Sequence, residues 1–318
     1  MYPKRKVMHI YGQEILPGEQ KQINLEIAKL PSRTPISIPV FVNRSTEPGP
    51  SLLIMAGMHG DEINGVEIVR RIMKQNLHIP ERGSIICIPI LNVYGFISQA
   101  RELPDGKDMN RSFPGSEKGS LASRVAYIMM HEIIPNIDLG IDFHTGGGIK
   151  TNFPQVRCKL EDEQNKELAK AFNAPFTLNS PFRAASLRSS AAKKGISILV
   201  YEGGESLRLD SFAIEQGIKG YQKVLCHLKM GNVHMNPDDK NIVLMNSSWI
   251  RARGSGIFQS NVKTGDYVSK GQFLGRICSP YTEFEIKVKS SKTGHVIALN
   301  HQAVVNQGDA LMHIGFEE

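Results

Sequence analysis

The first fifty residues carry short runs in which apolar and polar side chains alternate. Two such runs, at residues 22–28 and 36–42, are separated by Pro31, and Pro48-Gly49-Pro50 follows the second. A period of two is typical of a half-buried β-strand, and proline and glycine mark turns. The pattern therefore predicts an antiparallel β meander over residues 1–50.

Continuous apolar runs then replace the alternating ones. Residues 51–56 are mostly apolar and end at Gly57, residues 66–77 place apolar side chains at helical spacing, and residues 84–90 form a second apolar run. A strand, a helix and a strand in this order are typical of a sheet with helices on its faces.

The same alternation of strands and helices continues to residue 227. It predicts helices at 121–134, 161–172 and 211–227 and strands at 139–143 and 196–201. We therefore assign the α/β class, with a mixed, mostly parallel sheet flanked by helices.

The last eighty residues have a different character. Residues 236–241 are rich in turn-forming residues, and no helical period follows them. Gly265-Asp266 and Gly308-Asp309 lie in two similar stretches of turn and apolar strand, which predicts a small, barrel-like all-β module. The expected domains are an α/β domain at 1–235, which includes the meander, and the β module at 236–318.

The chain is basic, but its charge does not indicate a nucleic-acid partner. The 318 residues hold 38 Lys and Arg against 31 Asp and Glu, a net charge of +7, spread without a block of like charges. A single Trp leaves little to stack on bases, so we expect no nucleic acid. An anionic small molecule explains the balance equally well.

Two further features concern location and redox state. The apolar runs are interrupted at Gly57, Pro89 and Asn92, well short of a membrane span, and the basic N-terminus leads into no long apolar region. We expect a cytoplasmic protein without a membrane partner. Four cysteines without paired spacing, listed last, are expected to be reduced, buried thiols rather than a zinc ribbon. They are Cys87, Cys158, Cys226 and Cys278.

The strongest local motif runs from Gly57 to Gly65 and contains His59 and Glu62 between a buried strand and a helix. Ligands of open α/β sheets bind at the carboxyl ends of the strands, where this motif lies. An imidazole and a carboxylate three residues apart can bind one cation, and zinc suits nitrogen and oxygen ligands. The alternative is an ordinary solvated polar loop.

A second strand, at residues 139–143, leads into His144 and a glycine-rich turn. His144 would be a third ligand, and Asp142, on the same face of the strand, an acceptor that orients it. Three protein ligands with an open fourth position are typical of a catalytic zinc site, and we expect one zinc ion.

Two other segments hold candidates for substrate binding and proton transfer. In the polar loop 101–115, Asn110 and Arg111 suit a substrate carboxylate, and Arg101 could face a developing oxyanion. A buried strand delivers Glu202 to its carboxyl end, which makes Glu202 the expected general base. Glu205 is the competitor, and its alternative role is to cap the next helix.

These motifs together resemble the succinylglutamate desuccinylase/aspartoacylase family of the zinc carboxypeptidase-like superfamily. The resemblance covers about residues 45–230 and also includes the β module. It implies a zinc carboxypeptidase-like fold, the zinc ligands His59, Glu62 and His144, and a catalytic glutamate at Glu202. It further implies a substrate-carboxylate pair at Asn110 and Arg111 and an oxyanion arginine at Arg101.

The resemblance implies a zinc-dependent amidohydrolase that removes the acyl group from an N-acyl amino acid. It leaves the acyl group open. Arg183 and Arg188 are candidates for binding a second substrate carboxylate. A zinc carboxypeptidase that acts on acidic peptides and a non-catalytic carboxylate-binding protein are the alternatives.

The β module resembles a biotinyl or lipoyl carrier barrel. The hairpin at residues 281–285 lacks the lysine that such carriers present. We therefore interpret the module as a structural lid or a homo-oligomer surface.

Overall fold

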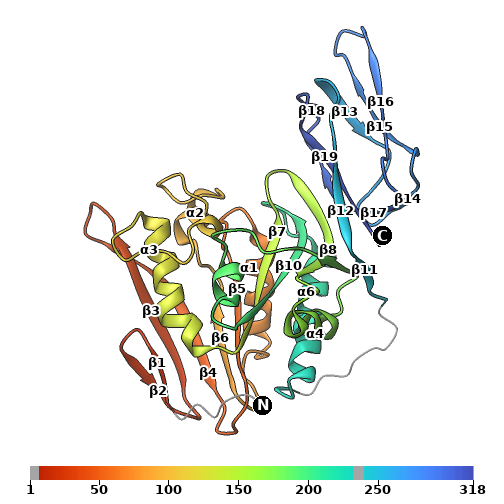
Figure 1. Cartoon of the computed structure of the whole chain (residues 1–318). Helices are drawn as coiled ribbons and strands as arrows, with labels where there is room; N and C mark the ends of the chain where they lie inside the picture. Colours follow the sequence, from red (N-terminus) through yellow and green to blue (C-terminus); the bar gives the residue numbers. More distant parts are fainter. Residues whose placement is uncertain (1–6, 232–239, 318) are drawn as a thin grey trace.

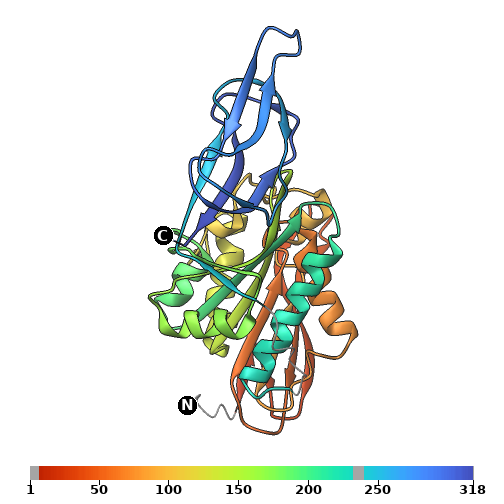
Figure 2. The same ribbon diagram turned by 90° about the vertical axis from the view of Figure 1, so that its right-hand side faces the viewer.

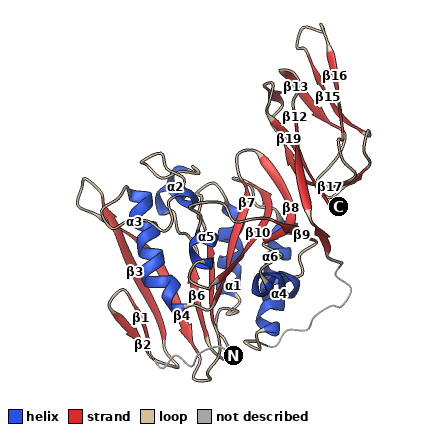
Figure 3. Cartoon of the chain, viewed as in Figure 1, coloured by secondary structure: helices blue, strands red, loops and turns tan. Residues whose placement is uncertain are grey.

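One long mixed sheet runs through the whole molecule. The computed structural model describes residues 7–231 and 240–317 (Figure 1). Within these residues the sheet has 13 strands, and its main path is β12-β19-β17-β8-β10-β7-β5-β6-β4-β3. Helices cover both faces of the central strands, so the predicted α/β class is confirmed (Figure 3).

The centre of the sheet is parallel and its flanks are antiparallel. The parallel strands are β10 (Ser197–Glu205), β7 (Leu139–Gly146), β5 (Ser51–Ala56) and β6 (Ser84–Ile88). On one side follow β4 and β3, and on the other β8, β17, β19 and β12, joined antiparallel along this path. Off the path, the short strand at Phe176–Asn179 pairs parallel with β8 and with the strand at Ile242–Leu244. The mixed sheet is confirmed, but "mostly parallel" describes only its centre. Hairpins need only short turns, whereas parallel neighbours need crossover helices, which this chain has only in its middle part.

Outside the β module, two strand pairs lie near the N-terminus, and one of them forms a sheet of its own. The meander forms β3 (Gln20–Lys29) and β4 (Pro35–Arg44), preceded by a separate hairpin of β1 (Met8–Ile10) and β2 (Gln13–Ile15). On the other side lie β8 (Lys150–Cys158) and the short β9 (Phe176–Asn179), neither of which was predicted.

Two hydrophobic cores lie on the two faces of the sheet. Leu52 and Ile54 of β5 face one core, whereas Leu53 and Met55 face the other, as expected of a strand that is buried on both sides. The first face is covered by α1 (Ile63–Lys74), α4 (Glu163–Phe172) and α6 (Ser211–His227). The second is covered by α2 (Val93–Ser98), α3 (Leu121–Ile128) and α5 (Leu187–Ala192).

All the predicted helices are present, with ends shifted by up to three residues and one of them divided. The helix predicted at 211–227 coincides with α6, and α1 begins three residues before the predicted residue 66. The helix predicted at 121–134 is divided, because a π turn at Met129–Ile133 and a 3-10 turn at Ile134–Asn136 follow α3. Pro135 lies in that last turn and cannot continue an α-helix.

The β module consists of strands only, within its described residues. The first are β11 (Ile242–Leu244), β12 (Asn246–Arg251), β13 (Gly256–Ser260), β14 (Tyr267–Val268) and β15 (Phe273–Cys278). The others are β16 (Glu285–Lys289), β17 (Gly294–Asn300), β18 (Val304–Val305) and β19 (Ala310–Phe316). Gly265 and Gly308 both have φ of +93°, which confirms the two predicted turns. Residues 236–239 of the predicted linker lie outside the described residues.

The module stands at one end of the α/β part and is joined to it through the backbone (Figure 2). β17 pairs antiparallel with β8, through Asn152, Thr151 and Lys150. A second, four-stranded sheet with the order β16-β15-β13-β18 completes the module. The long sheet therefore belongs to both parts of the chain.

The cysteines and the membrane prediction can be compared with this fold. None of the four cysteines forms a disulfide, but only Cys87 and Cys158 are buried, so the prediction of burial was wrong for Cys226 and Cys278, which are partly exposed. Cys226 lies near the end of α6 and Cys278 at the end of β15, where solvent reaches the chain. Among the described residues, no helix is long and apolar enough to cross a membrane.

Candidate metal centre and active-site pocket

The first two candidate ligands lie where β5 leads into α1. Gly57 has φ of +62°, a left-handed conformation that favours glycine, and it turns the chain after the strand. Gly65, in the first turn of α1, packs against β7, because a Cβ there would lie 2.3 Å from the carbonyl oxygen of Phe143. This close approach brings Glu62, just before α1, to His144 on β7.

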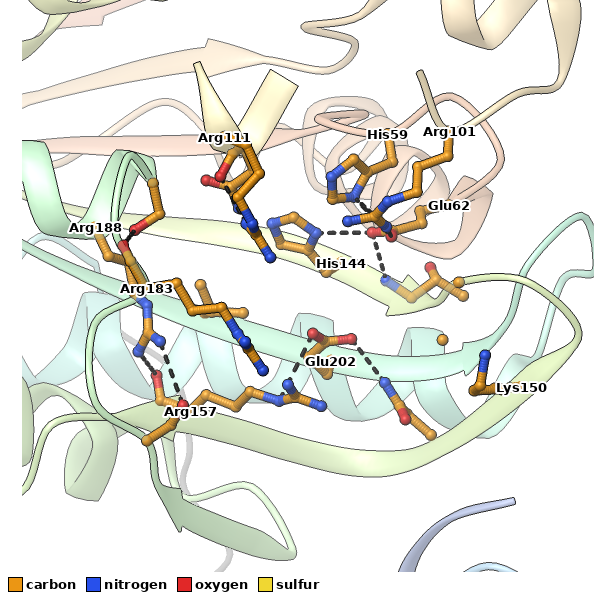
Figure 4. A pocket seen from close by; sticks show the side chains of 18 of the residues that line it. His59, Glu62, Arg101, Arg111, His144, Lys150, Arg157, Arg183, Arg188 and Glu202 are labelled. Carbon is orange, nitrogen blue, oxygen red and sulfur yellow. Dashed lines mark hydrogen bonds and ion pairs between the residues drawn. The ribbon is translucent and has the colours of Figure 1, made fainter. Parts of the chain in front are cut away.

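The three predicted ligands meet in one buried cluster (Figure 4). The Glu62 carboxylate lies 2.7 Å from Nδ1 of His59 through Oε1 and 2.7 Å from Nδ1 of His144 through Oε2. One ligand atom of each residue lies within 4.8 Å of the others. All three side chains are almost fully buried. The group could therefore hold a metal ion.

The outer nitrogens of both rings also face carboxylates. Nε2 of His59 lies 3.1 Å from Oδ1 of Asp108, and Nε2 of His144 lies 2.8 Å from Oδ2 of Asp142. A neutral imidazole has one N–H, so it can satisfy only one of two acceptors. Each ring can therefore satisfy both carboxylates only as an imidazolium or with a metal ion in place of one proton. The donor set, two imidazoles and a carboxylate, fits a divalent metal such as zinc.

The pKa shifts show the same excess of negative charge. Burial lowers the pKa of His144, but Asp142 and Glu62 outweigh it and raise that pKa well above its usual value. Burial raises the pKa of Glu62, yet His59 and His144 hold it well below the usual value. The two histidines thus hold Glu62 in its charged carboxylate form.

Arg101 lies at the edge of this cluster. Its Nη1 donates to Oε1 of Glu62 at 3.1 Å, and its Nη2 donates to Oδ2 of Asp108 at 2.9 Å. Asp108 therefore bridges Arg101 and His59. The structure brings Arg101 to the ligands and into the pocket, where it also has a fixed orientation.

Glu202 lies beside His144 on the next strand. The two residues are register partners of the parallel strands β10 and β7, so their side chains project from the same face. Nδ2 of Asn152 donates to Oε2 of Glu202 at 2.7 Å, and Nε of Arg157 lies 3.6 Å from Oε1. Glu205, the competitor, does not line the pocket and forms an ion pair with Arg208 at 3.9 Å.

The predicted substrate residues line the same cavity, of about 500 Å³. Oδ1 of Asn110 accepts a hydrogen bond from the backbone N–H of Leu187 at 3.0 Å, which leaves the amide nitrogen as its donating end. Arg111 is exposed and its guanidinium donates to the Asn110 carbonyl at 2.7 Å. The cavity is strongly cationic, since six basic side chains line it against two carboxylates. The basic residues are Arg101, Arg111, Lys150, Arg157, Arg183 and Arg188.

Arg188 is the buried member of this set. Burial and the neighbouring Arg157 lower the pKa of Arg188 to about 10, and its guanidinium donates to the Arg157 carbonyl at 3.1 Å. It also lies 5.5 Å from the centre of the Phe182 ring. Both predicted candidates for a second carboxylate, Arg183 and Arg188, line the pocket, and Arg188 is buried.

The family is decided by a match that covers more than half of the chain. The sequence model of the succinylglutamate desuccinylase/aspartoacylase catalytic domain matches residues 48–228. The chain belongs to this family. It is similar to an N-alpha-acetyl-L-2,4-diaminobutyric acid deacetylase from Halomonas elongata, with 28% identity over 293 residues, 87% of this chain and 84% of that protein.

Solved structures share the fold of this chain. The product-bound ectoine utilization protein EutE (DoeB) from Ruegeria pomeroyi has a TM-score of 0.84 at 21% identity and covers 99% of this chain and 100% of its own. A succinylglutamate desuccinylase/aspartoacylase from Rhodobacter sphaeroides has a TM-score of 0.82 at 22% identity, with 94% and 95% covered. The likeness extends through the β module in both.

Sequence reasoning missed several residues of this desuccinylase/aspartoacylase-type pocket. Asp108 stands two residues before Asn110 in the polar loop. The loop was recognised as functional, but the contacts of Asp108 with His59 and Arg101 were not predicted. Asn152 and Arg157 lie on β8, which carried no recognisable strand pattern. Trp249 reaches the pocket from the β module, and no local pattern indicated that contact.

Proposed function

We propose that this member of the family is a zinc-dependent amidohydrolase that removes the acyl group from an N-acyl amino acid. The observation that carries the proposal is the position of Glu202. It lies next to His144 on the neighbouring strand and faces a cationic cavity that also holds His59 and Glu62. A proton acceptor beside a three-ligand metal centre is the arrangement that hydrolysis of an amide requires.

His59, Glu62 and His144 would hold the zinc ion, and Asp108 and Asp142 would orient the two imidazoles through their outer nitrogens. When bound there, zinc supplies Lewis-acid chemistry, which makes water acidic enough to lose a proton near neutral pH and polarises the scissile carbonyl.

Residues of the loop 101–115, supported by α5, orient the substrate. The amide nitrogen of Asn110 and the guanidinium of Arg111 donate to the α-carboxylate of the substrate. Leu187 holds Asn110 in the required orientation through its backbone N–H. Arg101, fixed by Glu62 and Asp108, donates to the oxygen on which negative charge develops.

Glu202 performs both proton transfers. It accepts a proton from the attacking water and later gives that proton to the nitrogen of the leaving amine, as the carbon–nitrogen bond breaks. The products are a carboxylate and a free amino acid. The amide of Asn152 holds Oε2 of Glu202 in place during both steps.

A panel of amides tests this function. Free amine is measured after incubation with N-acetyl, N-succinyl and N-formyl amino acids, N-acetyl-2,4-diaminobutyric acid and short glutamyl peptides. Zinc-loaded protein should release amine from at least one acylated amino acid, and chelator-stripped protein should not. Cleavage of the peptides alone would instead support a carboxypeptidase, and binding without turnover of any compound would support a carboxylate-binding protein.

Three further proposals complete this assignment. Residues 1–235 form the catalytic domain, and residues 236–318 form the barrel-like module. The protein acts in the cytoplasm, which agrees with four cysteines that form no disulfide. A homo-oligomer is consistent with apolar side chains exposed on the module, among them Tyr281 and Val304, which are 79% and 65% exposed.

A further inference from the structure

A second cavity lies on the β module, and all of its charged side chains are basic. Its volume is about 450 Å³, and five cationic side chains line it without a single carboxylate. We call it the module groove. Its cationic residues are Arg251, Arg253, Lys270, Lys287 and Lys289.

The charges of the module groove are largely uncompensated. Arg251 donates to the carbonyl of Gly308 at 2.8 Å, and no ion pair within residues 7–231 and 240–317 involves any of the five. All five side chains are exposed. Exposed like charges that converge on one cavity attract an anion with several negative charges.

Two free strand edges form the walls. β12 pairs only with β19, and β16 pairs only with β15, among the strands that the structure describes. Consecutive residues of both strands line the groove, at 249–251 and 286–290, so the backbone edges themselves face it. Free edges can hydrogen-bond an extended peptide.

Trp249 connects the module groove to the active-site pocket, since its side chain lines both cavities. Its ring stacks on His313 at 4.3 Å between ring centres, with 5° between the planes. A molecule that extends from the metal centre past Trp249 therefore enters the groove.

We propose that the module groove binds the acidic peptide portion of a substrate whose scissile amide lies at the metal centre. The proposal rests on the proposed function, the cleavage of simple N-acyl amino acids such as acetyl-Glu, and adds that the acyl side of the same pocket also accepts a short acidic peptide. Asn110 and Arg111 hold the carboxylate of the leaving amino acid, so a chain that continues past Trp249 continues from the acyl side. The acyl group is then an acidic peptide of a few residues, bound along β12 and β16.

Lysines on free edges can also serve simply to prevent strands from pairing with other chains. The two roles differ in one respect. A protective edge does not bind an acidic peptide more tightly than a neutral peptide of the same length, whereas a subsite does.

The test compares three substrates: acetyl-Glu, acetyl-Glu-Glu-Glu-Glu and acetyl-Gln-Gln-Gln-Glu. Release of free glutamate is measured with zinc-loaded, full-length protein. Release from acetyl-Glu tests the proposed function, and the comparison of the two peptides tests the groove. We expect kcat/KM for the acidic peptide to exceed that for the glutamine peptide about tenfold at low salt, as several exposed ion pairs would produce. The preference for the acidic peptide should become smaller when the assay contains 0.5 M NaCl, because exposed charges are screened.

Two variants locate the effect. K287E/K289E should abolish the preference for the acidic peptide, whereas K240E/K263E, with the same charge change at exposed sites outside the groove, should retain it. Equal rates for both peptides, or equal loss in both variants, would overturn the proposal.

A binding measurement keeps this result separate from the proposed function. Trp249 is the only Trp in the chain, so its fluorescence reports on the groove without turnover. Saturable quenching by acetyl-Glu-Glu-Glu-Glu, weaker by about tenfold in K287E/K289E, is expected even if no amide is cleaved. Quenching by a thymidine tetranucleotide but not by the acidic peptide would overturn the proposal.

Discussion

Glu202 and His144 are direct neighbours across the parallel strands β10 and β7. The ladder that joins them shifts register between Glu202 and Glu205, immediately after the pair. The carboxylate and the candidate ligand are therefore attached to one rigid part of the sheet, and the irregular backbone begins only beyond them. A residue placed in this way keeps its distance from the metal centre without help from a loop.

Substitution of Glu202 by Gln removes the proton acceptor and keeps its shape. We expect kcat to fall by about 10²- to 10⁴-fold, with zinc content unchanged. Steady-state kinetics on the best substrate of the panel measure the first quantity and metal analysis the second. The control is Glu205→Gln, which should retain near-normal turnover. The reverse result, a large loss in Glu205→Gln only, would assign the proton transfer to Glu205.

Removal of either imidazole should abolish stable zinc binding. We expect His59→Ala and His144→Ala to contain little zinc after dialysis, because a site with two remaining protein ligands holds the ion weakly. His131→Ala is the control, since His131 lies on the surface and stacks on Tyr127. Full zinc occupancy in both of the first two variants would refute the ligand assignment.

Asp108 should support the site from outside. Asp108→Asn keeps the size of the side chain but weakens its contacts with His59 and Arg101. We expect zinc affinity to fall by about 10- to 100-fold, as for other residues that orient a ligand. Competition with a zinc-binding dye measures the change. Unaltered affinity would limit Asp108 to positioning Arg101.

His313 should make stability depend on pH. Burial and the nearby Arg157 lower the pKa of His313 to about 3, whereas the unfolded chain has the usual value of about 6.5. Above pH 6.5 the His313 ring is neutral in both states and does not change the free energy of unfolding. As the pH falls from about 6.5 toward 3, only the unfolded chain takes up the proton, so stability is lost at about 1.4 kcal/mol per pH unit.

His313→Phe isolates this contribution, because it keeps a ring beside Trp249 and removes the titration. Urea unfolding is followed by the fluorescence of Trp249. When the assay pH is lowered from 7 to 5, the free energy of unfolding should fall by about 2 kcal/mol more in the wild type than in the variant. Equal losses in the two proteins would show that His313 does not control acid stability.

The sequence predicted the elements whose pattern is local. Residues 51–56, 139–143 and 196–201 form solid apolar strands because both faces are buried, and each delivers a candidate residue to its carboxyl end. The metal cluster could be predicted because its ligands stand at the ends of the first two of these strands. Strand ends of a parallel sheet lie at one edge, so residues 85 positions apart in the chain, His59 and His144, could be expected to meet.

β8 could not be predicted in this way. Its sequence is polar and contains Pro154, which usually excludes an interior strand. In the structure the β10–β8 ladder shifts register between Glu202 and Gly204, next to the proline, so no ladder hydrogen bond is required there. The contact between Asn152 and Glu202 spans 50 positions and depends on that irregular pairing.

The shared strand pair of β8 and β17 makes the two parts of the chain one cooperative unit. Residues 298–300 of the module supply the backbone partners of residues 150–152, and Nε2 of Gln155 donates to the carbonyl of Ile297 at 3.1 Å. A truncated chain that ended at residue 231 would expose the 150–152 segment of β8 and loosen the amide that restrains Glu202. Loss of the module would therefore disturb the position of Glu202 through the backbone of β8. Both parts of the chain should unfold in a single thermal transition.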